Sequence, residues 1–269
     1  MEMRTVQERI QAKIHTNKEK GETEMNLSVV IPAFNEEKRI SNTLLKTNQY
    51  LKSKKFKFEI IVVNDASEDN TLSILNKSKI KNLKVITNHK NSGKGYSIRT
   101  GFFECKYDTV LVMDADLATP INQLIKLTPF MKNHDVVIGS RNMKNSKVLI
   151  TQNKIRQFFG KIYPKLVSAF VLKGFKDTQC GFKLFNARAV DRIKRRGLFD
   201  RFSFDVEAIL IAQRYGFKVV EVPVVWIDKP GSKVHLIRDS VTMLISLGII
   251  KLRDLQGVYV DKGTLKVQG

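Results

Sequence analysis

The sequence predicts an α/β fold, in which a mixed, mostly parallel sheet carries helices on both faces. Between residues 27 and 141, short apolar runs alternate with amphipathic stretches, which is typical of parallel strands joined by helices. Several apolar runs end in polar or acidic residues, and ligands of such folds bind beyond the carboxyl ends of the strands. A chain of 269 residues that is 42% hydrophobic is long enough for one large domain of this kind.

The first half of the chain contains five predicted strands, which span residues 27–32, 58–65, 83–88, 108–116 and 135–141. Amphipathic spacing predicts a helix over 37–54 and another that begins at about residue 121. An N-cap signal at Ser67 predicts a helix over 67–78. The Gly-rich segment 92–95 leads into a further helix that ends near residue 105.

The second half predicts basic amphipathic helices over 151–173, a helix over 201–217 and a last helix over 236–255. Residues 218–226 favour an edge strand, because Pro223 interrupts them. We therefore expect a polar N-terminal arm over 1–26, an α/β domain over 27–233, and a C-terminal amphipathic membrane-surface helix with its tail over 234–269.

The net charge of +21 is unevenly distributed, since residues 141–176 hold nine Lys or Arg and no acid. Such a block attracts nucleic acid, an anionic membrane surface or phosphorylated substrates. The stacking motifs of nucleic-acid-binding proteins do not accompany these cations, so nucleic acid is the remote alternative. The chain has two distant cysteines, no secretory leader and no run of about 18 apolar residues, so we expect a reducing compartment and no membrane span.

Asp114 and Asp116 directly follow the apolar run 110–113. Carboxylates at the end of a buried strand need a partner that offsets their desolvation. A divalent cation with oxygen ligands is the simplest such partner, and it would in turn hold a phosphorylated substrate. The residues Glu36 and Asp65 follow two other predicted strands, so a shared nucleotide crevice is expected at this edge of the sheet.

Six segments together carry a family resemblance: SVVIPAFNEE, IIVVNDASEDNT, NSGKGYSIRTGF, VLVMDADLATP, IGSR and DTQCGFKLF. In this order they resemble the motifs of family 2 glycosyltransferases of the GT-A (Rossmann-like) fold, over about residues 27–233. DADLATP followed by DTQCGFKLF is more similar to the dolichyl-phosphate β-glucosyltransferases than to the mannosyl enzymes. The latter often carry Gln where this chain has Ala118.

The resemblance implies inverting hexose transfer from a nucleotide diphosphate sugar, best UDP-glucose, to a polyprenyl (dolichyl-type) phosphate. It implies that Asp114 and Asp116 bind Mg2+ or Mn2+, with Asp116 the more direct ligand. It also implies a site for the nucleotide sugar, in which Lys233 belongs to a loop that closes over the diphosphate. That expected site comprises Pro32, Ala33, Asn35, Glu36, Asp65, Lys94, Gly95, Asp114, Ala115, Asp116 and Lys233.

The acceptor side is expected to be cationic, with Arg141, Arg156, Lys183 and Arg201 as candidates. A guanidinium binds phosphate through a fork of donors, which favours Arg141. A phosphate acceptor is already an anion and needs no general base, so Asp177 would orient a partner; a hydroxyl acceptor would need a base there. The predicted catalytic residues are therefore Asp116, Asp177 and Arg141.

Two related activities stay open at this point. One is a GDP-mannose-dependent polyprenyl-phosphate mannosyltransferase, and the other is a family 2 transferase that acts on a sugar hydroxyl in surface-polysaccharide synthesis. Basic amphipathic segments predict peripheral attachment to the cytoplasmic face of an anionic membrane. The sequence leaves the sugar, the base, the lipid length, the choice of metal and the oligomeric state open.

Overall fold

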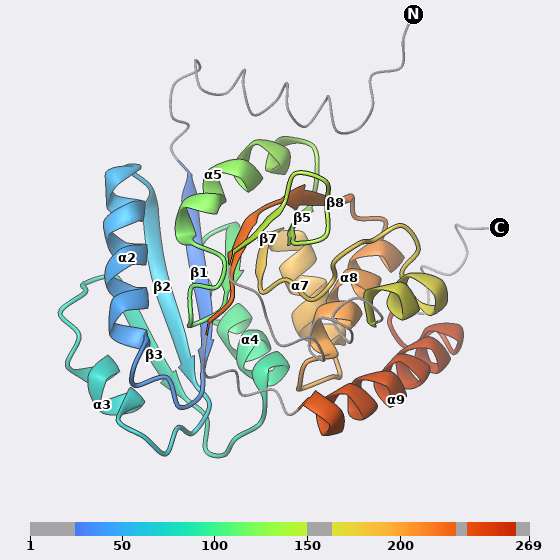
Figure 1. Cartoon of the computed structure of the whole chain (residues 1–269), viewed down its shortest axis with the longest axis horizontal. Coiled ribbons are helices and arrows are strands. Elements are labelled where there is room, and N and C mark those ends of the chain that lie inside the picture. Colours follow the sequence, from blue (N-terminus) through green and yellow to red (C-terminus); the bar gives the residue numbers. More distant parts are fainter. Residues whose placement is uncertain (1–24, 150–162, 230–235, 262–269) are drawn as a thin grey trace, which may run out of the picture.

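The computed structural model describes residues 25–149, 163–229 and 236–261. Nine strands alternate with helices along these residues (Figure 1). The strands are β1 (Asn26–Ala33), β2 (Lys57–Asn64), β3 (Leu83–Thr87), β4 (Thr109–Met113), β5 (Val136–Ser140), β6 (Lys147–Leu149), β7 (Phe182–Asn186), β8 (Val219–Pro223) and β9 (Val225–Ile227). The helices are α2 (Ile40–Ser53), α3 (Thr71–Asn76), α4 (Lys94–Phe103), α5 (Leu124–Leu127) between the 3-10 turns η1 (Ile121–Gln123) and η2 (Thr128–Lys132), α7 (Ala187–Arg196), α8 (Phe204–Arg214) and α9 (Leu236–Leu255).

Seven strands form one sheet in the order β3-β2-β1-β4-β7-β5-β8. Strand β7 runs antiparallel to both of its neighbours, β4 and β5, while the other pairs are parallel. Strands β6 and β9 form a separate two-stranded parallel ribbon. The mixed, mostly parallel sheet that the sequence predicts is therefore confirmed.

The core is divided by the sheet into two apolar layers. Along β1, Leu27, Val29 and Ile31 pack with α2, α3 and the segment from η1 to η2, whereas Val30 packs on the other side. That second side is covered by α4, α7, α8 and α9 (Figure 1). Residues that alternate along a strand point to opposite faces, so the continuous apolar runs of β1, β2 and β4 reflect burial on both sides.

Several predicted elements differ in extent. Helix α3 begins at Thr71 rather than at Ser67, because the preceding residues bind the loop after β1: Ser67 Oγ accepts from the N–H of Asn35, and Asp69 accepts from that of Glu37. The helix expected from residue 121 is a single α-turn between two 3-10 turns. Of the helices expected over 151–173, residues 163–170 are helical, while 150–162 lie outside the described residues.

The edge strand predicted over 218–226 is confirmed. Strand β8 lies at the end of the seven-stranded sheet, and it stops at Pro223, after which β9 begins in the ribbon. The predicted last helix is confirmed as α9, with the same bounds. In the three described parts of the chain, no helix combines the length and the apolar character needed to cross a bilayer.

Candidate active site

The two aspartates after β4 lie in a tight turn that other elements hold in place. Leu117 has a left-handed backbone with a φ of 54°, and the N–H of Ala118 donates to Asp116 Oδ1 at 2.8 Å. From α2, Thr43 Oγ1 donates to the carbonyl of Ala115 at 2.6 Å. Ala118 in turn accepts a hydrogen bond from the N–H of Ile227 in β9. The positions of both carboxylates therefore depend on α2 and on the β6–β9 ribbon.

Asp114 lies against the backbone of Gly181, just before β7. A Cβ atom at position 181 would come within 1.9 Å of Asp114 Oδ2, so only glycine leaves room for this carboxylate. On its other side, Asp114 Oδ1 accepts from Lys94 Nζ at 2.8 Å. About a third of the Asp114 side chain is exposed to solvent. The carboxylate is thus positioned by β7 and α4 yet remains open to a ligand.

Lys94 connects Asp114 to a buried ion pair. Its Nζ lies 3.8 Å from Asp205 Oδ2, and Asp205 Oδ1 also pairs with Lys183. Burial alone would lower the pKa of the Lys94 ammonium, but the charges of Asp114 and Asp205 outweigh this effect and raise the pKa. Lys94 therefore carries a positive charge beside the predicted metal site.

Lys183 lies in the interior and not on a phosphate-binding surface. Its side chain is 2% exposed, and Nζ donates to the carbonyl of Cys180 at 2.6 Å as well as pairing with Asp205. A lipid phosphate cannot reach an ammonium that is enclosed in this way. In this structure the interaction of Lys183 is with Asp205, which in turn lies beside Lys94.

Asp116 is the second candidate metal ligand. Burial raises its pKa, and the negative charge of Asp114 raises it further. A divalent cation between the two carboxylates would offset both effects, so these residues fit Mg2+ or Mn2+. Within residues 25–149, 163–229 and 236–261, no three His, Cys, Asp or Glu side chains gather as a metal cage. Mg2+ commonly needs only one or two carboxylates, because substrate phosphates and water complete its shell.

The loops expected to bind the nucleotide adjoin one another at the carboxyl ends of β1 and β2. Asp65 accepts from the N–H groups of Ser92 and Gly93 and from Asn88 Nδ2, at 2.7 to 3.0 Å, so its carboxylate anchors the Gly-rich loop. A Cβ atom at Gly95 would come within 2.5 Å of the Phe199 carbonyl. The glycine therefore lets this loop pack against the segment before α8.

The segment after β1 is held by contacts from the segment before α3. Asn35 has a left-handed φ of 53°, and its Oδ1 accepts from the N–H of Glu68. The N–H of Glu36 donates to Thr71 Oγ1, and the Glu36 carboxylate pairs with Arg39 at 2.6 Å. Pro32 and Ala33 complete β1, next to Val63 and Asn64 of β2. The predicted nucleotide residues of β1, β2 and β4 thus come from three adjacent strands.

Arg141 follows β5 and forms a bidentate ion pair with Asp177. Its Nε donates to Oδ2 at 2.7 Å and its Nη2 to Oδ1 at 2.8 Å, while its backbone N–H donates to Oδ2. The guanidinium carbon lies 5.5 Å from the centre of the Trp226 ring. The side chain is 26% exposed, so this cation is fixed in orientation but still accessible.

Asp177 has little capacity left for proton transfer. Its side chain is fully buried, and its two oxygens receive three hydrogen bonds from Arg141 and one from the N–H of Gln179. Burial would raise the pKa of this carboxyl group, but the charge and hydrogen bonds of Arg141 outweigh burial and lower it. The geometry is that of a residue that positions Arg141.

The remaining predicted residues are placed as follows. Arg201 is exposed, and its Cγ lies beside Gly93 of the Gly-rich loop. Arg156 and Lys233 lie outside the described residues. Sequence reasoning did not identify Gly181, Trp226 or Glu221. Gly181 lies within DTQCGFKLF, and Glu221 and Trp226 lie in the predicted edge strand 218–226. Their contacts depend on how β7, β8 and β9 are placed in space, which the sequence does not indicate.

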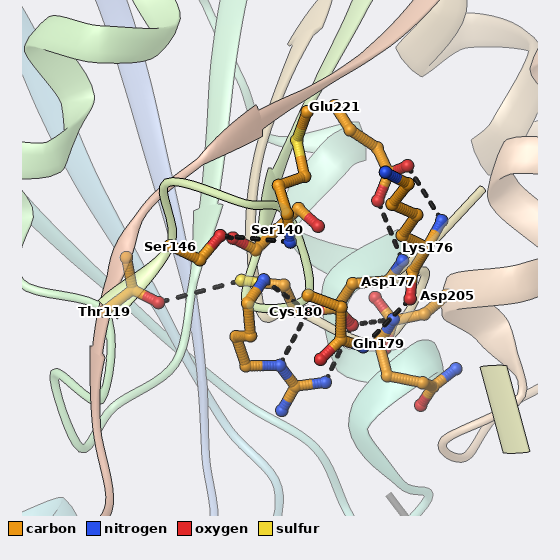
Figure 2. Close-up of polar contacts among 12 residues, drawn as sticks. Thr119, Ser140, Ser146, Lys176, Asp177, Gln179, Cys180, Asp205 and Glu221 are labelled. Atoms are coloured by element: carbon orange, nitrogen blue, oxygen red, sulfur yellow. Dashed lines mark hydrogen bonds and ion pairs between the residues drawn. The ribbon is translucent and has the colours of Figure 1, made fainter. Parts of the chain in front are cut away.

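The contacts around Asp177 form one polar cluster (Figure 2). The Glu221 carboxylate accepts from the backbone N–H groups of Lys176 and Asp177, each at 2.8 Å. Thr119 Oγ1 lies 3.7 Å from Cys180 Sγ, which connects the cluster to the turn after Asp116. Burial raises the pKa of the Cys180 thiol to about 11, and Asp177 adds to the shift, so this thiol is not a nucleophile at neutral pH.

The chain is similar to known glycosyltransferases in sequence and structure. The family model for Glycosyl transferase family 2 matches residues 28–194. A dolichyl-phosphate beta-glucosyltransferase of Saccharomyces cerevisiae is 34% identical over 266 residues, which cover 91% of this chain and 80% of that protein.

Two solved structures show the same fold. Glucosyl-3-phosphoglycerate synthase from Mycobacterium tuberculosis, in complex with Mn2+, UDP-glucose and phosphoglyceric acid, has a TM-score of 0.63 at 15% identity and covers 93% of this chain and 85% of its own. A mannosyltransferase from Pyrobaculum calidifontis, in complex with GDP-Man and Mn2+, has a TM-score of 0.59 at 18% identity, with 90% and 70% covered. The architecture is the GT-A fold.

Proposed function

Because this chain belongs to glycosyl transferase family 2, and is therefore a glycosyltransferase, we propose that it transfers glucose from UDP-glucose to a polyprenyl phosphate of the dolichyl type. One observation carries the choice of acceptor. The carboxylate on the acceptor side, Asp177, is fully bonded and buried, whereas Arg141 next to it is accessible. A site with a fixed cation and no available base suits an acceptor that is already an anion.

The names of the relatives support the same substrates. The yeast protein that is 34% identical over most of this chain is named a dolichyl-phosphate beta-glucosyltransferase. Ala118, where many mannosyl relatives carry Gln, favours the glucosyl donor. The N–H of Ala118 donates to Asp116, and its carbonyl accepts from the N–H of Ile227. This position therefore supports the turn, but its methyl side chain offers no ligand to a metal.

The donor is proposed to lie across the ends of β1, β2 and β4. Pro32, Ala33, Asn35 and Glu36 would adjoin the base and ribose, with Asp65 at the base edge. Lys94 and Gly95 would face the diphosphate, together with Ala115 and, from its loop, Lys233. The support is the shared edge of these residues and the raised pKa of Lys94, which keeps a cation next to the carboxylates.

Asp114 and Asp116 would hold the Mg2+ or Mn2+ ion. When bound, such a cation neutralises charge on the departing nucleoside diphosphate. Both solved structures named above contain Mn2+, which supports a divalent ion in this fold. Lys94 already contacts Asp114, so it contributes a second positive charge on the same side.

The proposed reaction is a single displacement at the anomeric carbon. An oxygen of the acceptor phosphate forms the new bond, the bond from that carbon to the diphosphate breaks, and the configuration inverts. Arg141 binds the acceptor phosphate and holds its attacking oxygen in line, and Asp177 fixes the guanidinium. Arg156 and Arg201 are proposed as further cations near the phosphate. No proton has to move at the nucleophile.

We propose that the enzyme is peripheral on the cytoplasmic face of a membrane. Helix α9 buries Leu247 and Ile250, but it exposes an apolar stripe on its other side. That stripe comprises Val241, Leu244, Ile245, Ile249, Leu252 and Leu255. An amphipathic helix of this kind lies in the interface of a bilayer, and nearby Lys and Arg favour anionic lipids.

A radiochemical transfer assay tests the proposed function. The protein is incubated with a polyprenyl phosphate in anionic vesicles and with labelled UDP-glucose or labelled GDP-mannose, with and without Mn2+. We expect label in the lipid phase from UDP-glucose only, and only with the metal. Label from GDP-mannose alone would identify the mannosyl activity, and transfer only to a sugar hydroxyl would overturn the choice of acceptor.

The Asp116→Asn variant tests the metal assignment in the same assay. Asn keeps the shape and removes the charge, so turnover should fall at least about a hundredfold. Calorimetry should also find that Mn2+ no longer increases the affinity for UDP, while the melting temperature is unchanged. Full activity and unchanged Mn2+ dependence in this variant would contradict the assignment.

A further inference from the structure

We propose that Glu221 is a positioning residue for the acceptor side, and that it acts on Arg141 through Asp177. This inference rests on the proposed function, in which Arg141 binds the acceptor phosphate. Glu221 lies in the edge strand β8, opposite Ile138 of β5. Its two carboxylate oxygens accept separately from the N–H groups of Lys176 and Asp177, each at 2.8 Å (Figure 2).

The contacts form a chain that ends at the guanidinium. Glu221 fixes the backbone at residues 176 and 177, and Asn142 Nδ2 also donates to the Lys176 carbonyl at 2.9 Å. The turn is therefore held at its amides and at its carbonyl. The Asp177 side chain leaves this fixed backbone, is fully buried, and makes its bidentate pair with Arg141.

A carboxylate is required at position 221 because both groups that contact it, the N–H groups of Lys176 and Asp177, are hydrogen-bond donors. Two successive N–H groups need two acceptor oxygens, and an ionised carboxylate supplies them. The substitution Glu221→Gln would replace one of these oxygens with an NH2 group, which is itself a donor and would face an N–H. The turn would then shift on one side. The Asp177 side chain would move with it, because the Asp177 backbone is part of this turn.

The effect of such a shift should be specific to the acceptor. Arg141 directly follows β5 and Glu221 lies on β8, at the opposite end of the sheet from β2 and β3. Asp65, Lys94 and Asp114 receive no contact from Glu221 in the part of the chain that is described. Glu221 therefore sets the affinity for a phosphate acceptor and leaves the binding of the nucleotide sugar unchanged.

Steady-state kinetics with UDP-glucose and citronellyl phosphate, a short soluble polyprenyl phosphate, test the inference. In Glu221→Gln we expect the acceptor KM to rise about tenfold, with the donor KM and the melting temperature close to wild type. Glu104→Gln is the matched control, because Glu104 makes an exposed ion pair with Lys84 far from the acceptor side. It should leave both KM values unchanged.

A double variant tests the route of the effect. If Glu221 acts through Arg141, then Glu221→Gln adds little to the loss already caused by Arg141→Lys, because interacting sites are non-additive. Fully additive losses, or an equal rise in the donor KM, would overturn the inference.

A binding measurement separates this inference from the proposed function. The affinity for citronellyl phosphate is measured by calorimetry without any donor. If wild type binds it and Glu221→Gln binds it equally well, then the role of Glu221 is refuted while the function stands. If wild type neither binds nor glucosylates this phosphate, then the proposed function fails first and takes the role of Glu221 with it.

Discussion

The Asp114 carboxylate packs directly against a residue that lacks a side chain. The nearest approach to a Cβ atom at Gly181 would be 1.9 Å, far inside van der Waals contact, and both oxygens of Asp114 would be crowded. Gly181 has no left-handed backbone that would explain its presence. At the scale of single residues, the candidate metal site therefore requires glycine at position 181 as well as the two carboxylates.

The substitution Gly181→Ala should abolish activity without unfolding the protein. The new methyl group would displace Asp114 from Lys94 and from the proposed cation, and a misplacement of about 1 Å can cost about a hundredfold in rate. Glucosyl transfer and UDP affinity in the presence of Mn2+ are the measurements. Gly248→Ala is the control, because nothing lies within 4 Å of that position in α9; wild-type activity in Gly181→Ala would contradict the packing argument.

The two cysteines should be unreactive in the native protein. Burial, together with the nearby charges of Asp177 and Glu59, raises the pKa of Cys180 to about 11 and that of Cys105 to about 12. At about pH 8 the native state therefore contains very little thiolate. In the unfolded chain both thiols have their ordinary pKa of 9.0, so the reactive thiolate is more abundant. Ellman's reagent should label both thiols rapidly only in denaturant, and fast native labelling would contradict this burial.

The same shifts determine how stability depends on pH. Because the thiol pKa is higher in the folded state, the stabilisation is complete below about pH 9 and is lost as the pH rises through the folded values. The free energy of unfolding, measured with guanidinium at a series of pH values, should therefore fall between about pH 9 and 12. The loss should be smaller in the double variant Cys105→Ala, Cys180→Ala.

At the scale of elements, α9 has two apolar sides, and in the described part of the chain one of them packs against the core while the other is exposed. Leu247 and Ile250 pack into the core that α4, α7 and α8 share, whereas Ile245, Leu252 and Leu255 are 62%, 56% and 72% exposed. A helix that is buried on one side normally presents polar residues on the other. The exposed stripe supports the proposed contact with lipid.

Acidic substitutions in this stripe should weaken membrane binding and leave the fold intact. An apolar side chain of this size contributes about 1.5–3 kcal/mol when it leaves water, so Ile245→Glu or Leu252→Glu should each lower the affinity for vesicles at least about tenfold. Co-sedimentation with phosphatidylserine vesicles measures this. Leu45→Glu in α2, where Leu45 is 51% exposed, is the control; equal loss in the control would argue against a specific role of α9.

The elements themselves were predictable to different degrees. Strands β1, β2 and β4 are continuous apolar runs that end in polar residues, so both their existence and the edge they share follow from the sequence. Helix α3 is shorter than predicted, because Ser67 binds the backbone of the loop after β1 and does not cap a helix. Asp69 accepts both from that loop and from the N–H of Thr71, so the helix begins only at Thr71. Whether a polar side chain caps its own helix or binds another loop depends on tertiary structure.

The candidate site shows the same division. Asp114 and Asp116 stand out in sequence because charges follow an apolar strand. The interior position of Lys183 cannot be recognised in the sequence, because a lysine in FKLF is typical of a surface cation. Its burial follows from the placement of β7 between β4 and β5, which brings Lys183 to Asp205. The role of Glu221 cannot be recognised in the sequence either, since its partners are backbone N–H groups, which every residue but proline carries.

At the scale of the whole molecule, the surplus of positive charge belongs mainly to the later part of the chain. The acid-free block 141–176 begins at the end of β5, next to the proposed acceptor side. Charge distributed in this way raises the rate and strength of association with an anionic surface, and salt screens it. The net charge of +21 thus supports the proposed association with an anionic membrane and says little about the fold.

Membrane binding should therefore depend on salt as well as on α9. Raising NaCl from about 0.05 to 0.5 M shortens the screening length severalfold, so affinity for phosphatidylserine vesicles should fall strongly. Affinity for neutral phosphatidylcholine vesicles, which reflects the apolar stripe, should change little. Binding to anionic vesicles that does not vary with salt would show that the basic block makes no contribution.

The antiparallel strand β7 also affects how the protein is made. The ribosome releases the chain from its N-terminus, so β4 emerges well before β7, the strand that pairs with it in the middle of the sheet. During this interval β4 exposes unpaired N–H and C=O groups, which other chains can bind. Nascent chains that end before Phe182 should thus aggregate unless a chaperone covers this edge. The edge of β4 can be paired only when β7, which ends at Asn186, has left the ribosomal tunnel.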